Sequence, residues 1–136
     1  MVVSGQCLCG RVRYQGDAEP RFQVKCYCTD CRKVNAAGHA AIMGFPTDAI
    51  RVKGEVKEHH SRADSGSDVT RAFCPACGAG IYARNEAMPG MIFLSASTLD
   101  DPNLFAPQLV DNASRAPAWN QVLLGVPAFA EGPPGN

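Results

Sequence analysis

The sequence lacks an excess of either charge and lacks any long apolar run. Its 13 lysine and arginine residues balance 13 aspartate and glutamate residues, with no long run of like charges. Proteins that bind nucleic acids or anionic membranes carry basic patches, so we expect neither partner. No stretch approaches the roughly 20 apolar residues of a membrane-spanning helix, and the first residues have no secretory leader pattern. We expect a cytoplasmic protein that acts on a small molecule or another protein.

Helical periodicity is also missing. No segment keeps an apolar repeat of about 3.6 residues through several turns, whereas glycine (13 residues) and proline (10 residues) are frequent. These features predict a mainly β fold of meanders and hairpins, with short helical turns after Thr29, around 47–49 and around 114–120. The expected strands are 10–15, 22–26, 39–44, 51–53, 56–61, 69–73, 80–83, 91–95 and 108–110.

The chain has the length of one domain. Its 136 residues can bury one core but not the cores of two ordinary domains. We place a single domain at residues 1–130. The remaining residues, 131–136, read EGPPGN and are expected to form a flexible tail.

What the chain does have is seven cysteines. Disulfides rarely persist in a reducing compartment, so this number favours metal ligation. The cysteines form three groups: CxC at Cys7 and Cys9, CxCxxC at Cys26, Cys28 and Cys31, and CxxC at Cys74 and Cys77. A closed zinc site needs four ligands, and a catalytic site keeps three ligands with one open position. Only one partition uses every thiol without dividing a group.

The four-ligand site takes the first and last groups. The segment CPACG at 74–78 resembles a zinc knuckle, in which glycine gives the backbone the freedom to turn its amides toward sulfur. Residues two apart in an extended chain share a face, so Cys7 and Cys9 can meet one ion while Leu8 faces the core. The alternative is that these residues are reduced core thiols. The proposed ligands are Cys7, Cys9, Cys74 and Cys77.

The middle group, Cys26, Cys28 and Cys31, is expected to hold a second zinc with one open position. Three thiolates outweigh the charge of the dication, so nearby donors are needed, and Arg32 and Lys33 are candidates. Thiolate-rich zinc favours a further soft ligand, for which a substrate thiol is the natural choice. Such a thiolate can attack an electrophilic carbonyl and form a carbon–sulfur bond. The alternative is a second structural zinc.

The other candidate residues are expected to have structural rather than catalytic roles. His39, His59 and His60 are expected to be ordinary surface or core histidines, with the last two on opposite faces of a strand. Trp119 is expected to pack in the core, although it could stack on a ligand. The sequence shows no Ser/His/Asp arrangement and no phosphate-binding glycine loop.

The cysteine motifs resemble those of the glutathione-dependent formaldehyde-activating enzyme family, whose domain is shared with centromere protein V. The similar segments are GQCLCG at 5–10 with VRY at 12–14, CYCTDCRK at 26–33 and FCPACG at 73–78, with weaker matches as far as Trp119. Many relatives have histidine between the first two middle cysteines, where this chain has Tyr27.

The resemblance implies a β-rich fold of the Mss4-like type, a structural zinc at the four-cysteine site and a catalytic zinc at Cys26, Cys28 and Cys31. It also implies an activity, the joining of glutathione to formaldehyde to give S-(hydroxymethyl)glutathione, which is a carbon–sulfur lyase reaction. The first hypothesis is therefore a zinc-dependent lyase that acts on adducts of a glutathione-like thiol and a small aldehyde. The alternative is a non-catalytic zinc module that binds a protein. Nucleic-acid binding like that of the centromere relative is disfavoured by the zero net charge.

Overall fold

The structure is a computed structural model that describes residues 1–120 and 125–134. Within these residues the regular structure consists of ten strands, one α-helix and four 3₁₀ turns. The prediction of a mainly β fold with short helical turns is confirmed. In the described part of the chain, no helix has the length and apolarity needed to cross a membrane.

A three-stranded antiparallel sheet is built from the N-terminal part of the chain. Its order is β1 (Val2–Gln6), β2 (Arg13–Asp17) and β5 (Ile50–Lys53). Alternate side chains of β1 and β2 face the core, so Val3 and Tyr14 are buried. Gly5 lies opposite Tyr14 and must lack a side chain, because a Cβ there would overlap the Tyr14 ring.

The larger sheet has seven strands in the order β10-β3-β4-β9-β8-β7-β6. Their bounds are β3 (Phe22–Cys26), β4 (Ala40–Pro46), β6 (Lys57–Arg62), β7 (Asp68–Phe73), β8 (Gly80–Asn85), β9 (Met91–Ser95) and β10 (Leu109–Asp111). All neighbours are antiparallel except β10, which pairs in parallel with β3. The expected pattern of meanders and hairpins therefore fails at this edge, because β10 returns from the far end of the chain.

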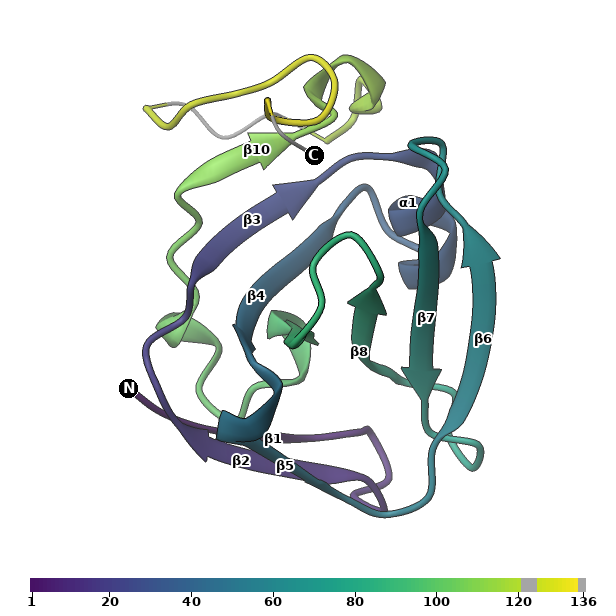
Figure 1. Ribbon diagram of the computed structural model, residues 1–136, viewed down its shortest axis with the longest axis vertical. Coiled ribbons are helices and arrows are strands. Elements are labelled where there is room, and N and C mark those ends of the chain that lie inside the picture. Colours follow the sequence, from purple (N-terminus) through teal and green to yellow (C-terminus); the bar gives the residue numbers. More distant parts are fainter. Residues whose placement is uncertain (121–124, 135–136) are drawn as a thin grey trace.

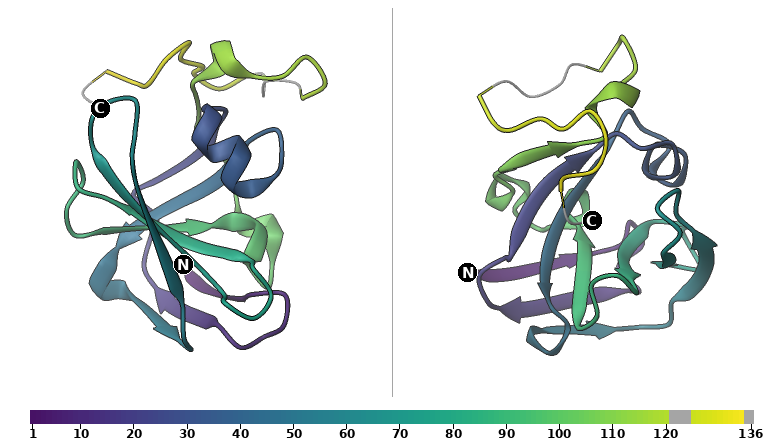
Figure 2. Two further views of the ribbon diagram at one scale, coloured as in Figure 1. Left: turned by 90° about the vertical axis from the view of Figure 1, so that its right-hand side faces the viewer. Right: turned by 45° about the horizontal axis from the view of Figure 1, so that its top comes forward.

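Side chains from both sheets form one hydrophobic core. The sheets lie crosswise, with β1, β2 and β5 across the lower end of the larger sheet (Figure 1). In both views of Figure 2 the helix lies in the upper half of the molecule, away from the three-stranded sheet. The largest fully buried side chains are Tyr27, Phe45, Met43, Ile81, Ile92 and Leu94.

The single helix α1 (Thr29–Asn35) connects β3 to β4. It was expected after Thr29, but its N-cap is Cys28, whose Sγ accepts a hydrogen bond from the Cys31 N–H. Asp30 lies in the first turn and two basic residues lie in the last, as the helix dipole favours. The helix ends at Ala36, which adopts a left-handed conformation.

The 3₁₀ turns partly match the expectation. Turns were expected at η1 (Thr47–Ala49) and near η4 (Ala113–Arg115), whereas η2 (Ala96–Thr98) and η3 (Pro102–Leu104) were not predicted. The strand β1 was also missed. Of the tail predicted at 131–136, residues 135–136 lie outside the described residues, and Glu131 accepts a backbone hydrogen bond from Asn112 at 3.1 Å.

Candidate metal centres

The first cysteine cluster joins two distant turns at one end of the molecule. Four Sγ atoms, those of Cys7, Cys9, Cys74 and Cys77, all lie within 4.8 Å of one another. The Sγ of Cys9 is 3.6 Å from that of Cys7 and 3.7 Å from that of Cys74. Four thiols at this separation match the donor set of a closed tetrahedral site for a soft metal ion.

The two turns share one hydrogen-bonding scheme. In the first, the Cys7 N–H donates to the Val12 carbonyl at 2.9 Å. In the second, the Cys74 N–H donates to the Ala79 carbonyl at 3.0 Å. Each turn contains a glycine with positive φ, at +78° for Gly10 and +79° for another glycine in the second turn. This backbone curls each segment around its sulfurs, which explains why β2 begins at residue 13 rather than at the predicted residue 10.

The geometry around Leu8 differs from the prediction. Residues 7–10 form a turn rather than an extended strand, so Leu8 points to solvent and is 86% exposed. Cys9 is also exposed, whereas Cys7 is buried in the core. The two sulfurs meet because the chain turns between them, and alternation along a strand is not the cause.

The thiols of this cluster do not ionise independently. Burial raises the pKa of Cys7, but the Val12 N–H and the neighbouring thiols outweigh it and lower the pKa to about 6. For Cys9, the Arg11 N–H lowers the pKa, yet burial and the same thiols raise it to about 11. The Ala79 and Cys9 N–H groups also lower the pKa of Cys77. Thiolates therefore form readily at Cys7 and Cys77 and only with difficulty at Cys9. A bound cation would remove this penalty.

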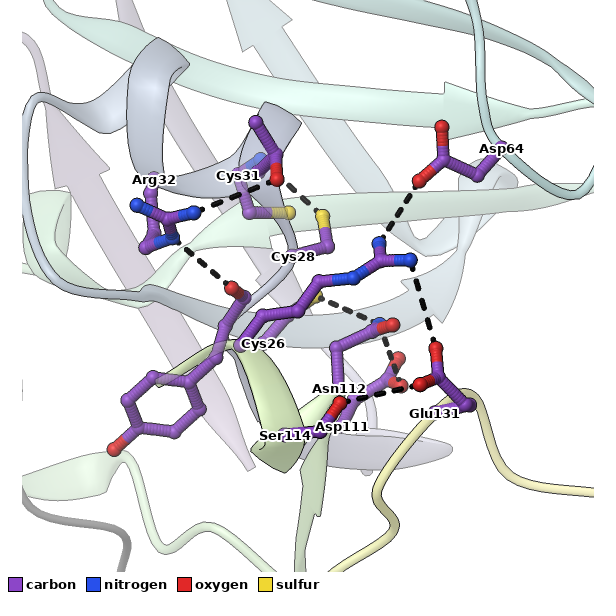
Figure 3. Close-up of polar contacts among 12 residues, drawn as sticks. Cys26, Cys28, Cys31, Arg32, Asp64, Asp111, Asn112, Ser114 and Glu131 are labelled. Carbon is purple, nitrogen blue, oxygen red and sulfur yellow. Dashed lines mark hydrogen bonds and ion pairs between the residues drawn. The ribbon is translucent and has the colours of Figure 1, made fainter. Parts of the chain in front are cut away.

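The second cluster lies at the other end of the molecule, where β3 runs into α1 (Figure 3). The Sγ atoms of Cys26, Cys28 and Cys31 lie within 4.8 Å of one another. Cys26 is buried at the end of β3, whereas Cys28 and Cys31 are half-buried. Three thiols at this distance can hold a metal ion, and the partial exposure leaves one side of the cluster accessible.

Residues from the C-terminal part of the chain complete the surroundings of this cluster. Asn112 follows β10 in a left-handed conformation, with φ at +54°. Its Nδ2 donates to the Cys26 Sγ at 3.7 Å and to the Asp111 Oδ1 at 2.9 Å (Figure 3). Burial, together with the negative charge of Cys28, raises the pKa of Asp111 to about 6. The parallel pairing of β10 with β3 is what brings these polar groups to the sulfurs.

Proton sharing is strong in this cluster. Hydrogen bonds from Cys26 and Cys31 lower the pKa of Cys28, with help from the Cys31 N–H and the Arg71 guanidinium, although burial opposes them. The pKa of Cys26 is raised, because it gives up its hydrogen bonds to the other two sulfurs on ionising and because it is buried. The cluster thus holds one negative charge at Cys28 and resists further charge without a cation.

The cations facing Cys28 are not the predicted ones. Arg32 donates to the Tyr27 carbonyl at 3.2 Å and to the Thr29 hydroxyl at 3.4 Å, rather than to sulfur. Lys33 is exposed and donates to none of the described residues. The charges that act on the cluster come instead from Arg71 on β7 and from Arg115.

Arg115 is held by a pair of acidic residues from two other segments. Its Nη1 lies 2.8 Å from the Asp64 Oδ2, and its Nη2 lies 3.5 Å from the Glu131 Oε2. The hydrogen bond to Asp64 and the charges of Glu131, Asp64 and Cys28 raise the pKa of Arg115, although burial opposes them. Arg71 and Arg115 were not predicted, because only the folded arrangement of β7 and the C-terminal segment brings their charges to act on the cluster.

The remaining candidates lie outside both clusters. Among the described residues no histidine joins either group of sulfurs. His39 Nδ1 lies 3.3 Å from the Asn120 Oδ1, and burial lowers the pKa of His39. His59 and His60 lie on the exposed strand β6. Trp119 is 74% exposed, so its predicted place in the core is wrong.

Three comparisons describe what the chain is similar to. A sequence model of the glutathione-dependent formaldehyde-activating enzyme family matches residues 2–113. A Halomonas elongata protein, provisionally named a glutathione-dependent formaldehyde-activating enzyme, is 29% identical over 107 residues, which cover 74% of this chain and 67% of that protein. A crystal structure of a Rhodobacter sphaeroides protein aligns with a TM-score of 0.58 over 76% of this chain and 96% of the other. At 20% identity, this last likeness shows the fold alone.

Proposed function

Because the chain belongs to the glutathione-dependent formaldehyde-activating enzyme family, we propose that it is a carbon–sulfur lyase of the S-(hydroxymethyl)glutathione synthase type. It would join a glutathione-like thiol to formaldehyde or another small aldehyde, or cleave the adduct. The observation that carries this proposal is the cluster of Cys26, Cys28 and Cys31, which has three thiols and a partly exposed side. A purely structural site would be expected to close itself with a fourth ligand.

Two zinc ions are part of the proposal. The four-cysteine cluster would hold a structural zinc, because it closes on itself and ties β1 and β2 to β7 and β8. The three-cysteine cluster would hold the second zinc. When bound there, the ion would supply a positive centre that stabilises a deprotonated substrate thiol near neutral pH. Since both sites need reduced cysteines, we place the protein in the cytoplasm.

The proposed reaction needs no oxidant or reductant. The thiol loses its proton, its sulfur forms a bond to the aldehyde carbon, and the π electrons of the carbonyl move to oxygen. The oxygen then takes a proton and becomes a hydroxyl, and cleavage reverses these steps. Arg71 and Arg115 favour negative charge on sulfur at the cluster, while Asn112 donates a hydrogen bond to Cys26.

The test combines metal analysis with exchange spectroscopy. We expect about two zinc equivalents per chain in fresh, reduced protein, and accelerated exchange between glutathione plus formaldehyde and their adduct by NMR. A protein with two zinc ions that does not change the exchange rate would refute the lyase and favour a protein-binding zinc module. A protein without bound transition metal would refute both.

A further inference from the structure

A shallow groove of about 230 Å³ lies along the last turn of α1. Its lining is formed by Arg32, Lys33, Ala36, Ala37 and Trp119. Among the described residues, the lining combines two cations and one indole with no acidic residue. A site of this composition suits a carboxylate attached to a flat organic group.

The cations of the groove have no acidic partner within the described residues. Arg32 uses its donors on the Tyr27 carbonyl and the Thr29 hydroxyl, neither of which neutralises its charge. Lys33 is exposed, and no contact ties its ammonium to another described group. By contrast, Arg115 nearby is paired with two carboxylates. The positive charge of the groove therefore remains available to an anion.

Contacts of the neighbouring residue Asn120 fix the turn that carries the exposed indole. The Asn120 N–H donates to the Pro117 carbonyl at 2.9 Å and closes a turn around Trp119. The Asn120 side chain bonds to His39 at 3.3 Å and packs on buried Gly38, where a Cβ would overlap the Asn120 amide. The turn is thus attached to the segment that follows α1. Trp119 lies against the helix without being buried. Its apolar indole therefore stays exposed to water and adds no packing to the core.

The groove is within reach of a thiol bound at the sulfurs. Arg32 directly follows Cys31, and the groove continues from there through the last turn of α1 to Ala36 and Ala37. Glutathione carries its thiol on the central residue and a carboxylate at each end. Each arm spans roughly 4–7 Å at about 3.5 Å per residue. A thiol at the cluster can therefore place one carboxylate in the groove.

We propose that this groove binds a carboxylate of the thiol substrate, with Arg32 and Lys33 pairing the carboxylate and Trp119 covering the adjoining amide. The identity of the occupant as a glutathione-like thiol rests on the proposed function. The preference for a carboxylate rests on the groove itself. The groove would then distinguish glutathione from small neutral thiols, which lack this contact.

Trp119 provides the assay, because it is the single tryptophan of the chain. The zinc-loaded protein is titrated with S-methylglutathione, which keeps both carboxylates but has no free thiol, and with its dimethyl ester, which has neither carboxylate. We expect a saturable change in Trp119 emission with S-methylglutathione and at least tenfold weaker binding of the ester. Lys33→Gln should weaken binding of S-methylglutathione about tenfold. The matched control Lys53→Gln, an exposed lysine on β5, should leave it unchanged.

These measurements test carboxylate binding in the groove and the lyase reaction independently. Equal binding of the acid and the ester, or equal effects of Lys33→Gln and Lys53→Gln, would overturn the groove even if the wild type catalyses the exchange. Carboxylate-dependent binding in a protein that does not accelerate the exchange would overturn the lyase and support the groove. An unchanged emission during turnover of glutathione would also overturn the groove.

Discussion

Replacement of Cys9 by serine tests the structural role of the four-cysteine cluster. Cys9 is exposed, so serine leaves no cavity in the core, and the effect reports on the lost ligand. The cluster joins Cys9 to Cys74, 65 positions apart along the chain. A cross-link that closes a loop of this length contributes about 4 kcal/mol through the entropy of the unfolded chain. This is a large share of the roughly 5–15 kcal/mol that stabilises an ordinary domain.

The loop that the three-cysteine cluster closes is much shorter. Each doubling of loop length adds about 0.6 kcal/mol, so the loop from Cys9 to Cys74 contributes about 2 kcal/mol more than the loop from Cys26 to Cys31. We expect Cys9→Ser to lose about one zinc equivalent and to lower the melting temperature by about 10–15 °C. Cys28→Ser should lower it by much less. Differential scanning calorimetry with zinc analysis of the same samples measures both.

The control comes from the same turn. Leu8 is 86% exposed, so Leu8→Ser should keep its zinc and melt close to the wild type. The reasoning is wrong if Cys9→Ser loses its zinc yet melts within a few degrees of Leu8→Ser. It is also wrong if Cys9→Ser and Cys28→Ser lose equal stability, because loop length would then not matter.

Three further predictions concern the other end of the molecule. Cys28→Ser should lower the zinc content by about one equivalent and abolish the exchange seen by NMR while the protein stays folded; retained turnover would contradict it. Gly38→Ala should destabilise by about 1–3 kcal/mol in denaturant titrations, because its Cβ overlaps the Asn120 amide. Burial and the Cys28 charge raise the pKa of Asp111 to about 6. In the metal-free protein, where no cation offsets the Cys28 charge, the folded state therefore binds the extra proton and loses stability as pH rises from about 4 to about 6. Asp111→Asn should raise the melting temperature at pH about 7.5 and leave it unchanged near pH 4, and an equal shift at both values would refute this.

Local patterns in the sequence predicted much of the fold. β3 and β9 have the predicted bounds, because β9 is a short apolar run and β3 alternates Phe22 and Val24 with polar residues. The strand β1 was missed because its five residues include a glycine and a serine, and its identity as a strand depends on pairing with β2. The grouping of the cysteines followed from their spacing alone, and the structure gathers the sulfurs in the same two sets. Their roles as zinc ligands stay predictions.

The surroundings of the clusters could not be predicted from local sequence. Arg71 and Arg115 act on Cys28 through their charge from segments that lie far along the chain from it. Leu8 and Trp119 have apolar side chains, and apolar type favours burial, but both lie in turns that direct them outward. Sequence patterns thus predicted the two groups of cysteines, whereas the charges and the exposed indole around them depend on tertiary contacts.

The position of Cys28 couples the start of α1 to the state of its sulfur. The same Sγ accepts a hydrogen bond from the Cys31 amide at 3.3 Å and belongs to the three-cysteine cluster. Any group that draws electron density from this sulfur weakens the bond and lets the first helical turn fray more often. The rate of deuterium uptake at the Cys31 amide would therefore report what occupies the sulfurs, even during catalysis. The backbone itself carries the signal, and no reporter needs to be attached.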